Sequence, residues 1–437
     1  MTISQPTPGA PDKHLNLRVR GLGASATVAI NERCNALRLE GRDVFKLGLG
    51  QSPFPVPSRV VESLREHAAE KDYLPVQGLK ALRHAVAEYT SRKIDVAGHR
   101  ETNVLIGPGS KELLFLLQLS YYGDLVVPAP AWVSYAPQAE IIGRRVRHIP
   151  TTPEDRWMLS PEAFERLCAE EPDRPRLLIL NYPSNPTGAT FSDEALEAIA
   201  QVARRYRALV LSDEIYGEVH HTGEHHSIAR HYPEGTIVSS GLSKWCGAGG
   251  WRLGTFVFPP DLDWLRKAMT AVASETYTST SAPIQYAAIT AFEGGPDIES
   301  YLAASRRTLG ALGRFCHHGL EAVGVPCPAP EGGFYLFPDF EPIRPALEAD
   351  GIHEAGALCE KLLQDTGVAI LPGSAFGRPA HELTTRLAYV DFDGEGALAA
   401  ESGQTLDDAW LARHCPSVVQ AVERIQDWTE TQRAKTR

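Results

Sequence analysis

Long apolar segments, paired cysteines and an excess of positive charge are all missing from this sequence. No apolar run approaches the ~20 residues that a membrane-spanning helix needs. The formal net charge of -11 argues against a nucleic-acid-binding surface, which would need clustered Lys and Arg. Residues 1–23 are rich in Pro and Gly and lack the apolar core of a signal peptide, so we expect a flexible arm there. These absences favour a soluble, cytoplasmic protein.

The seven cysteines are scattered, odd in number and never arranged as CxxC. Free thiols in a reducing compartment explain this pattern better than a disulfide framework or a zinc site. Two histidine pairs, His220-His221 and His225-His226, bracket a Thr-Gly-Glu turn, but nothing nearby in the sequence supplies a full set of metal ligands. We therefore predict a solvated loop at these histidines and no metal site.

Short apolar runs alternate with longer amphipathic stretches between about residues 57 and 275. The apolar runs occur at residues 103–106, 124–127, 176–180, 208–211, 236–238 and 255–258. They are rich in Val, Leu and Ile without strict alternation, as strands covered on both faces should be. Helical stretches lie between them, for example at residues 78–93, 110–121, 192–206 and 261–273. This alternation predicts an α/β fold with a mainly parallel sheet and helices on both faces.

The rest of the chain suggests a second, smaller αβ unit. The pattern is mostly helical from residue 284 to about 322, and strands are expected near residues 333–337, 368–371 and 385–390. A final helix is expected near residues 418–429. We expect an N-terminal arm and part of a small domain at residues 1–56, a large domain at 57–325 and a C-terminal small domain at 326–437. The small domain would thus be built from both chain ends.

Unusual segments follow the expected strands of the large domain. Residues 181–188 (NYPSNPTG), 212–216 (SDEIY) and 241–244 (GLSK) each come directly after one, and residues 107–111 (GPGSK) join a strand to a helix start. Open parallel sheets bind ligands beyond the carboxyl ends of their strands, and exposed N–H groups at a helix start favour an anion. Each segment alone is usually a turn or a solvated charge. Their joint occurrence at strand ends indicates a ligand site.

Residues 241–254 (GLSKWCGAGGWRLG) match, at every constrained position, the cofactor-attachment signature of the class I/II aminotransferases. These are fold-type I pyridoxal-phosphate enzymes. The resemblance extends from residues 25–31 (SATVAIN) through residues 372–374 (PGS) to Arg386, and it looks closest to the bacterial and archaeal aspartate aminotransferases. It implies a large cofactor-binding domain with a mainly parallel sheet of the seven-stranded type, flanked by helices, and pyridoxal 5'-phosphate as the cofactor.

The resemblance assigns five residues to the cofactor ring. Lys244 would hold the cofactor as a Schiff base and then act as acid and base in proton transfer. Burial should lower its pKa. Asp213 would pair with the protonated ring nitrogen. Asn185 and Tyr216 would bond the ring hydroxyl oxygen, and Trp132 would stack on the ring.

The resemblance also implies a phosphate site. Arg252 and Ser243 would hold the phosphate beside backbone N–H groups of Ser110 and Lys111. Tyr73 resembles the tyrosine that reaches the phosphate in the neighbouring subunit, which implies a homodimer. Gly241 stands where many relatives carry a phosphate-binding serine, so that contact would be missing.

The substrate residues implied by the resemblance come from several separate parts of the chain. Arg386 would clamp the α-carboxylate through a bidentate fork that lysine cannot reproduce. Gly50 would present its backbone to the same carboxylate, beside Trp132 and Asn185. Lys111 would reach a distal carboxylate. We therefore predict amino transfer between an L-amino acid, aspartate or glutamate, and a 2-oxo acid such as 2-oxoglutarate.

Other interpretations stay open. A β-lyase or decarboxylase of the same fold, or an aminotransferase for aromatic or other donors, would use the same cofactor contacts. A regulator with a fused DNA-binding domain is disfavoured, because the residues before the fold show no helix-turn-helix pattern. Pro53 replaces an acidic residue usual in the family, and residues 392–415 form a longer connection than usual.

Overall fold

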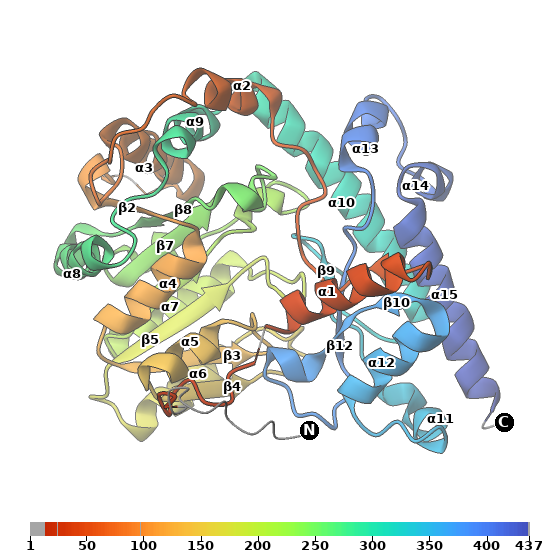
Figure 1. Ribbon diagram of the computed structural model, residues 1–437. Coiled ribbons are helices and arrows are strands. Elements are labelled where there is room, and N and C mark those ends of the chain that lie inside the picture. The colour runs from red at the N-terminus through yellow and green to blue at the C-terminus, as the bar shows by residue number, and fades with distance from the viewer. Residues whose placement is uncertain (1–13, 24, 97, 436–437) are drawn as a thin grey trace, which may run out of the picture.

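The computed structural model describes residues 14–23, 25–96 and 98–435 (Figure 1). Of the expected N-terminal arm, residues 1–13 lie outside the described residues, and residues 14–23 are exposed. No described helix combines the length and the apolar character needed to cross a membrane.

A seven-stranded sheet lies at the centre of the molecule, with the strand order β2-β8-β7-β6-β5-β3-β4. The strands are β2 (Val104–Gly107), β3 (Asp124–Ala129), β4 (Val146–Pro150), β5 (Arg176–Asn181), β6 (Leu209–Asp213), β7 (Thr236–Gly241) and β8 (Gly254–Val257). Only β8 runs in the direction opposite to that of the other six strands. The mainly parallel sheet is confirmed. β4 was not predicted from the sequence, because it is an edge strand on which Arg147 and His148 interrupt the apolar pattern.

Both faces of this sheet are covered, because alternate strand residues point to opposite sides. Leu177 and Ile179 of β5 pack into a cluster with α4 (Ser110–Ser120), α5 (Tyr135–Ile142) and α8 (Asp263–Glu275). Leu178 and Leu180 pack on the other face with α6 (Pro161–Glu170) and α7 (Asp193–Arg205). The start of α7 was expected at Ser192, whose side chain accepts a hydrogen bond from the N–H of Ala195 at 3.2 Å.

The smaller αβ part uses both chain ends, as predicted (Figure 1). From the N-terminal end come α1 (Ala26–Leu39) and β1 (Phe45–Lys46), and β1 pairs with β10 (Val368–Ala369). A second small sheet has the order β11-β12-β9 and consists of β9 (Tyr335–Leu336), β11 (Leu371–Pro372) and β12 (Thr385–Ala388). The domain boundaries at residues 56 and 325 remain a proposal.

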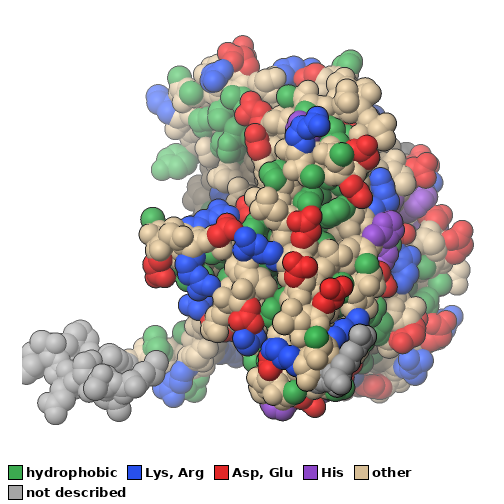
Figure 2. All heavy atoms as spheres, turned by 90° about the vertical axis from the view of Figure 1, so that its right-hand side faces the viewer, with side chains coloured by type: hydrophobic (Ala, Val, Ile, Leu, Met, Phe, Trp, Pro, Cys, Tyr) green, Lys and Arg blue, Asp and Glu red, His purple; other side chains and the backbone are tan. Residues whose placement is uncertain are grey.

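Helices surround these sheets and join the two parts. On the side of the large sheet lie α2 (Ser58–Glu66), α3 (Lys80–Ile94) and α9 (Ala282–Glu293), and the long helix α10 (Pro296–Ala322) leads from there to the smaller part. That part contains α11 (Arg344–Ala349), α12 (Ala355–Thr366) and α15 (Pro416–Ala434). Residues 392–415, the connection that is longer than usual in the family, form α13 (Gly394–Glu401) and α14 (Asp408–His414). These two helices pack on α10 and α15, respectively. Figure 2 shows this side of the molecule, where acidic and basic side chains are interspersed rather than gathered into a basic patch.

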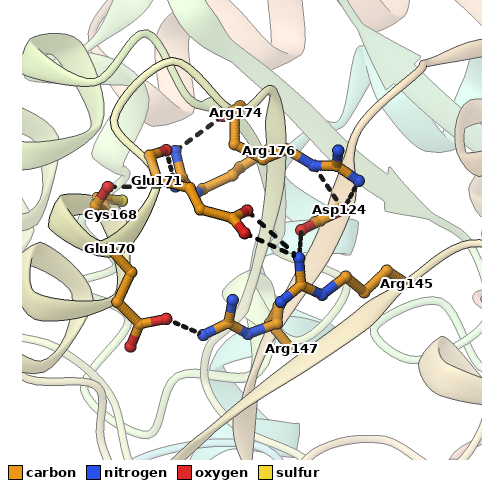
Figure 3. Close-up of polar contacts among 8 residues, drawn as sticks. All are labelled: Asp124, Arg145, Arg147, Cys168, Glu170, Glu171, Arg174 and Arg176. Atoms are coloured by element: carbon orange, nitrogen blue, oxygen red, sulfur yellow. Dashed lines mark hydrogen bonds and ion pairs between the residues drawn. The ribbon is translucent and has the colours of Figure 1, made fainter.

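Ion pairs hold the amino ends of β3, β4 and β5 together (Figure 3). Asp124, at the start of β3, is buried and pairs with Arg174 at 2.7 Å and Arg145 at 3.5 Å. Arg176, at the start of β5, donates to the backbone carbonyls of Arg174 at 2.7 Å and Cys168 at 3.2 Å, the second of which lies in the last turn of α6. These contacts satisfy the charges at the amino edge of the sheet and leave the carboxyl edge for a binding site.

Candidate active site

A cavity of about 490 Å³ opens at the carboxyl edge of the large sheet. Eleven of the twelve predicted site residues line it: Gly50, Ser110, Lys111, Trp132, Asn185, Asp213, Tyr216, Ser243, Lys244, Arg252 and Arg386. Most of them follow directly from strand ends, since β6 ends at Asp213 and β7 ends three residues before Lys244. Parallel strands bring residues that are far apart in sequence to one edge.

Lys244 lies within this cavity beside two aromatic rings. Its Nζ donates a hydrogen bond to the Gly50 carbonyl at 2.8 Å and lies 5.4 Å from the ring centre of Tyr216 and 5.7 Å from that of Phe334. Burial, reinforced by the positive charge of Arg386, lowers the pKa of Lys244 to about 8. An amine with such a pKa is partly unprotonated near neutral pH, as a nucleophile or base must be.

Asp213 is a buried carboxylate with hydroxyl donors. The hydroxyl of Tyr135 donates to its Oδ2 at 2.5 Å, and that of Ser239 donates to its Oδ1 at 3.4 Å. Burial raises the pKa of Asp213 to about 6, although the hydrogen bond from Tyr135 opposes this rise. Within the described part of the chain, Asp213 forms no ion pair at salt-bridge distance. A carboxylate removed from water in this way fits a cationic N–H group of a ligand.

The start of α4 forms a crowded, positively charged corner of the cavity. Gly109 has a left-handed φ of 91°, and a Cβ there would lie 2.2 Å from Nη2 of Arg252. A Cβ on Gly254 would lie 2.1 Å from the backbone nitrogen of Ser110. The helix start and the guanidinium therefore approach each other closely, and together with Lys111 they fit a phosphate group.

Arg386 lies on β12 and is completely buried. Its Nη1 donates to Oδ1 of Asn185 at 3.2 Å, and its Nη2 donates to the Gly48 carbonyl. The guanidinium carbon lies 4.8 Å from the ring centre of Tyr335. Nε of Arg386 is buried and has no hydrogen-bond partner among the described residues. A fixed guanidinium with spare donors beside a cavity suits a carboxylate.

The relatives of this chain agree with that chemistry. The sequence matches the family described as Aminotransferase class I and II over residues 42–390. The chain belongs to this family. It is 31% identical over 382 residues to the aspartate aminotransferase of Bacillus subtilis, covering 85% of this chain and 93% of that protein. It is 32% identical over 379 residues to the aspartate/prephenate aminotransferase of Thermus thermophilus, covering 86% of this chain and 94% of that protein.

A solved structure confirms the fold of this aminotransferase. The aspartate aminotransferase of Thermus thermophilus with maleate superposes with a TM-score of 0.82 at 30% identity, covering 95% of this chain and all of that one. This chain is therefore a pyridoxal-phosphate-dependent enzyme that acts on small amino and 2-oxo acids.

The residues present fit the cofactor. The positive corner at α4 suits its phosphate, the unpaired carboxylate of Asp213 suits its ring nitrogen, and Lys244 lies in the same cavity. The structure also explains why position 241 is a glycine, because a Cβ there would lie 2.7 Å from the Leu253 carbonyl oxygen. The backbone thus leaves no room for the serine that many relatives carry.

Several residues that line the cavity of the aminotransferase were not predicted from the sequence, and Tyr335 is the most buried of them. Its hydroxyl lies 2.8 Å from that of Tyr216, and a Cβ on Gly50 would lie 1.9 Å from it. Tyr335 therefore links the Gly50 turn to Tyr216. The Gly332-Gly-Phe-Tyr335 run in an expected strand was the available sequence signal. Thr27 and Tyr135 also line the cavity and were not identified.

Tyr73 is the one predicted site residue that does not line the cavity. Its side chain is 90% exposed. Its assignment to a neighbouring subunit stays a prediction.

The expected solvated histidine loop is wrong for two of its members. His220 is buried, and Nε2 of His225 lies 2.9 Å from Oε2 of Glu214, next to Asp213 in sequence. The Glu214 carboxylate also accepts a hydrogen bond from Ser212 at 2.7 Å. His220 and His225 are therefore held by contacts within the fold instead of facing solvent. All seven cysteines are buried free thiols, as expected.

Proposed function

We propose that this enzyme transfers the amino group of aspartate or glutamate to a 2-oxo acid such as 2-oxoglutarate. One observation carries the proposal: besides Lys244 and Arg252, which the cofactor would engage, the cavity contains two further cationic side chains. These are Arg386 of β12 and Lys111 of α4. Nζ of Lys111 lies 5.0 Å from the Trp132 ring centre and has no hydrogen bond or ion pair among the described residues. Two cations match the two carboxylates of an acidic amino acid.

The similar proteins support the same acidic class of substrate. The two curated relatives are named for aspartate, and the solved Thermus structure contains maleate, which is a dicarboxylate. A cation at a helix start is electrostatically unfavourable, so the lysine at this position favours an anionic ligand nearby.

The proposed roles are those that the family resemblance implies, and the position of these residues around one cavity supports them. The cofactor, when bound, would supply an electron sink and would also carry the amino group between the two substrates. Arg386 binds the α-carboxylate and fixes the orientation of the Cα–H bond, helped by the Gly50 backbone. Nζ of Lys244 takes the proton from Cα and later returns one, which its lowered pKa permits. Asp213 holds a positive charge at the ring nitrogen.

Four further residues would complete the cofactor contacts. Asn185 and Tyr216 would bond the ring oxygen, while Trp132 would cover the ring face. Ser243 would join Arg252 at the phosphate. Each of these residues lines the cavity.

The test is a Lys111→Ser variant assayed with aspartate, glutamate and an aromatic donor. Removing one partner of a buried charge pair costs about 2–5 kcal/mol, or roughly one to four decades in kcat/KM. Lys111 is exposed to the cavity, so we expect the low end, a loss of about tenfold or more for acidic donors only. Lys80→Ser, which changes another exposed first-turn lysine on α3, is the matched control. Equal losses for all donors would refute the acidic assignment.

The need for a 2-oxo acid acceptor distinguishes an aminotransferase from a lyase or a decarboxylase. A decarboxylase releases carbon dioxide and a β-lyase eliminates the side-chain group, and neither consumes a 2-oxo acid. Product formation that is independent of 2-oxoglutarate would favour these alternatives. Preference for phenylalanine over aspartate would favour an aminotransferase for aromatic donors.

We also propose that the enzyme is a cytoplasmic homodimer, with Tyr73 reaching the phosphate of the partner. The exposure of Tyr73, which does not line its own cavity, supports the dimer. The free cysteines support a reducing compartment such as the cytoplasm. Sedimentation velocity of the holoenzyme tests it, and a fully active monomer would contradict it. Tyr73→Phe should weaken cofactor retention without altering the fold.

A further inference from the structure

Three side chains of metal-ligand type converge near the end of α10. His317 and Glu321 lie in the last turns of this helix, and Cys327 lies in the loop after it. One ring nitrogen, one carboxylate oxygen and the thiol sulfur all lie within 4.8 Å of one another. Sγ of Cys327 is 3.7 Å from Nδ1 of His317. None of the three residues lines the active-site cavity.

Backbone contacts hold these side chains together. His317 and Glu321 are four residues apart and therefore lie on one face of the helix. The chain then reverses at Gly324, whose φ is +66° and whose N–H donates to the Glu321 carbonyl at 2.8 Å. The N–H of Cys327 donates to Oε1 of Glu321 at 3.0 Å. Cys327 stands between Pro326 and Pro328, which restrict the loop further.

The spacing suits a tetrahedral zinc site. Zinc binds sulfur at about 2.3 Å and nitrogen at about 2.0–2.1 Å, so tetrahedral ligands of these types lie about 3.6 Å apart. The distance between Cys327 and His317 is close to this value. Thiolate and imidazole select zinc over magnesium or calcium, which prefer oxygen ligands. We propose that His317, Glu321 and Cys327 bind one zinc ion.

A neighbouring cavity offers a route for the ion. This cavity of about 250 Å³ is lined by Glu321, Cys327 and Asp339, among others. Zinc would displace the proton of the Cys327 thiol, which passes to solvent as the Zn–S bond forms, and water would fill the fourth position. The site would clamp the loop to α10 ahead of β9. Because the site lies outside the active-site cavity and would tie this loop to the helix, zinc should raise the Tm of the holoenzyme and leave kcat unchanged.

The first experiment uses the wild-type holoenzyme, treated with chelator, dialysed and loaded with one equivalent of zinc. Its X-ray absorption spectrum should contain one sulfur neighbour at about 2.3 Å. A first shell made only of nitrogen and oxygen would overturn the proposal, because it would place the ion elsewhere, for example at the histidines near residue 225. This measurement does not depend on the folding of any variant.

The second experiment measures zinc affinity by competition with a chromophoric chelator. Cys327→Ser, His317→Gln and Glu321→Gln should each weaken binding by at least about tenfold, the scale on which even outer-shell partners affect metal affinity. The matched control is His318→Gln, which changes the adjacent histidine and should bind zinc like the wild type. Unchanged affinity in Cys327→Ser would overturn the proposal, as would a loss in His318→Gln equal to that in His317→Gln.

Discussion

Arg386→Lys is the sharpest perturbation of the proposed substrate site, because it keeps the positive charge and removes the planar fork. The guanidinium is completely buried, with one donor bonded to Asn185 and one to Gly48. A lysine ammonium cannot satisfy both acceptors and also present two parallel donors to a carboxylate. The variant therefore loses at least one charge-assisted hydrogen bond to the substrate. Such a bond contributes about 1.5–3 kcal/mol, so kcat/KM should fall by about one to two decades.

The assay compares α-amino acids with an amine that lacks the α-carboxylate. Arg386→Lys should lose activity toward the amino acids and keep the slow turnover of the amine. Circular dichroism and Tm would establish that the variant folds, since poorly satisfied groups at Asn185 and Gly48 also cost about 1–3 kcal/mol of stability. A kcat/KM for amino acids within about threefold of the wild type, corresponding to less than about 0.7 kcal/mol, would refute the reasoning. Equal losses for the amine would refute it as well.

Three further predictions concern the lysine, the buried carboxylate and the histidine loop. Lys244→Ala should lower turnover by several decades in steady-state assays, and activity near wild type would overturn the scheme. Burial raises the pKa of Asp213 from 3.8 to about 6, so the folded cofactor-free protein keeps a proton that the unfolded chain releases. Its stability should therefore fall as pH rises from about 4 through 6, by up to about 3 kcal/mol. Urea unfolding should show this loss, and Asp213→Asn should abolish it; an identical pH dependence in both proteins would contradict the assignment. Exhaustive chelation should leave turnover unchanged, because no proposed catalytic step uses a metal. Turnover that is lost on chelation and restored by zinc would contradict this prediction.

Much of the large sheet could be predicted because its strands are covered on both faces. β5 and β6 consist mainly of buried aliphatic residues, which mark them clearly. β4 lies at the edge, and Ile149 is its one buried residue, so the strand admits Arg147 and His148. The sequence pattern of a half-exposed strand with charged residues resembles that of a loop, and β4 was missed for this reason.

The cofactor side of the cavity was also predictable, because its residues follow strand ends within a few positions. Tyr335 was harder to predict because β9, on which it lies, has only two residues. The residues that the Tyr335 side chain approaches, Gly50 and Tyr216, are also distant in sequence. The histidine loop shows the same difficulty. The side chain that orders His225 is Glu214, eleven residues earlier and at the end of another element. Contacts of this kind follow from the tertiary fold and leave no local pattern.

The proposed cofactor and substrate residues come largely from different parts of the chain. This separation affects how the substrate preference of the enzyme can change. The proposed ring and phosphate contacts in the cavity all come from residues 110–252, whereas Gly50, Tyr335 and Arg386 come from the two flanks. Exchange of the flanking segments would therefore alter the amino acids that are accepted and leave the cofactor contacts intact. Three proposed substrate contacts are exceptions, because Lys111, Trp132 and Asn185 also lie within residues 110–252. Of these, Lys111 lies at the phosphate corner and is proposed to bind the distal carboxylate. Acidic specificity is thus the property that such an exchange would transfer least completely.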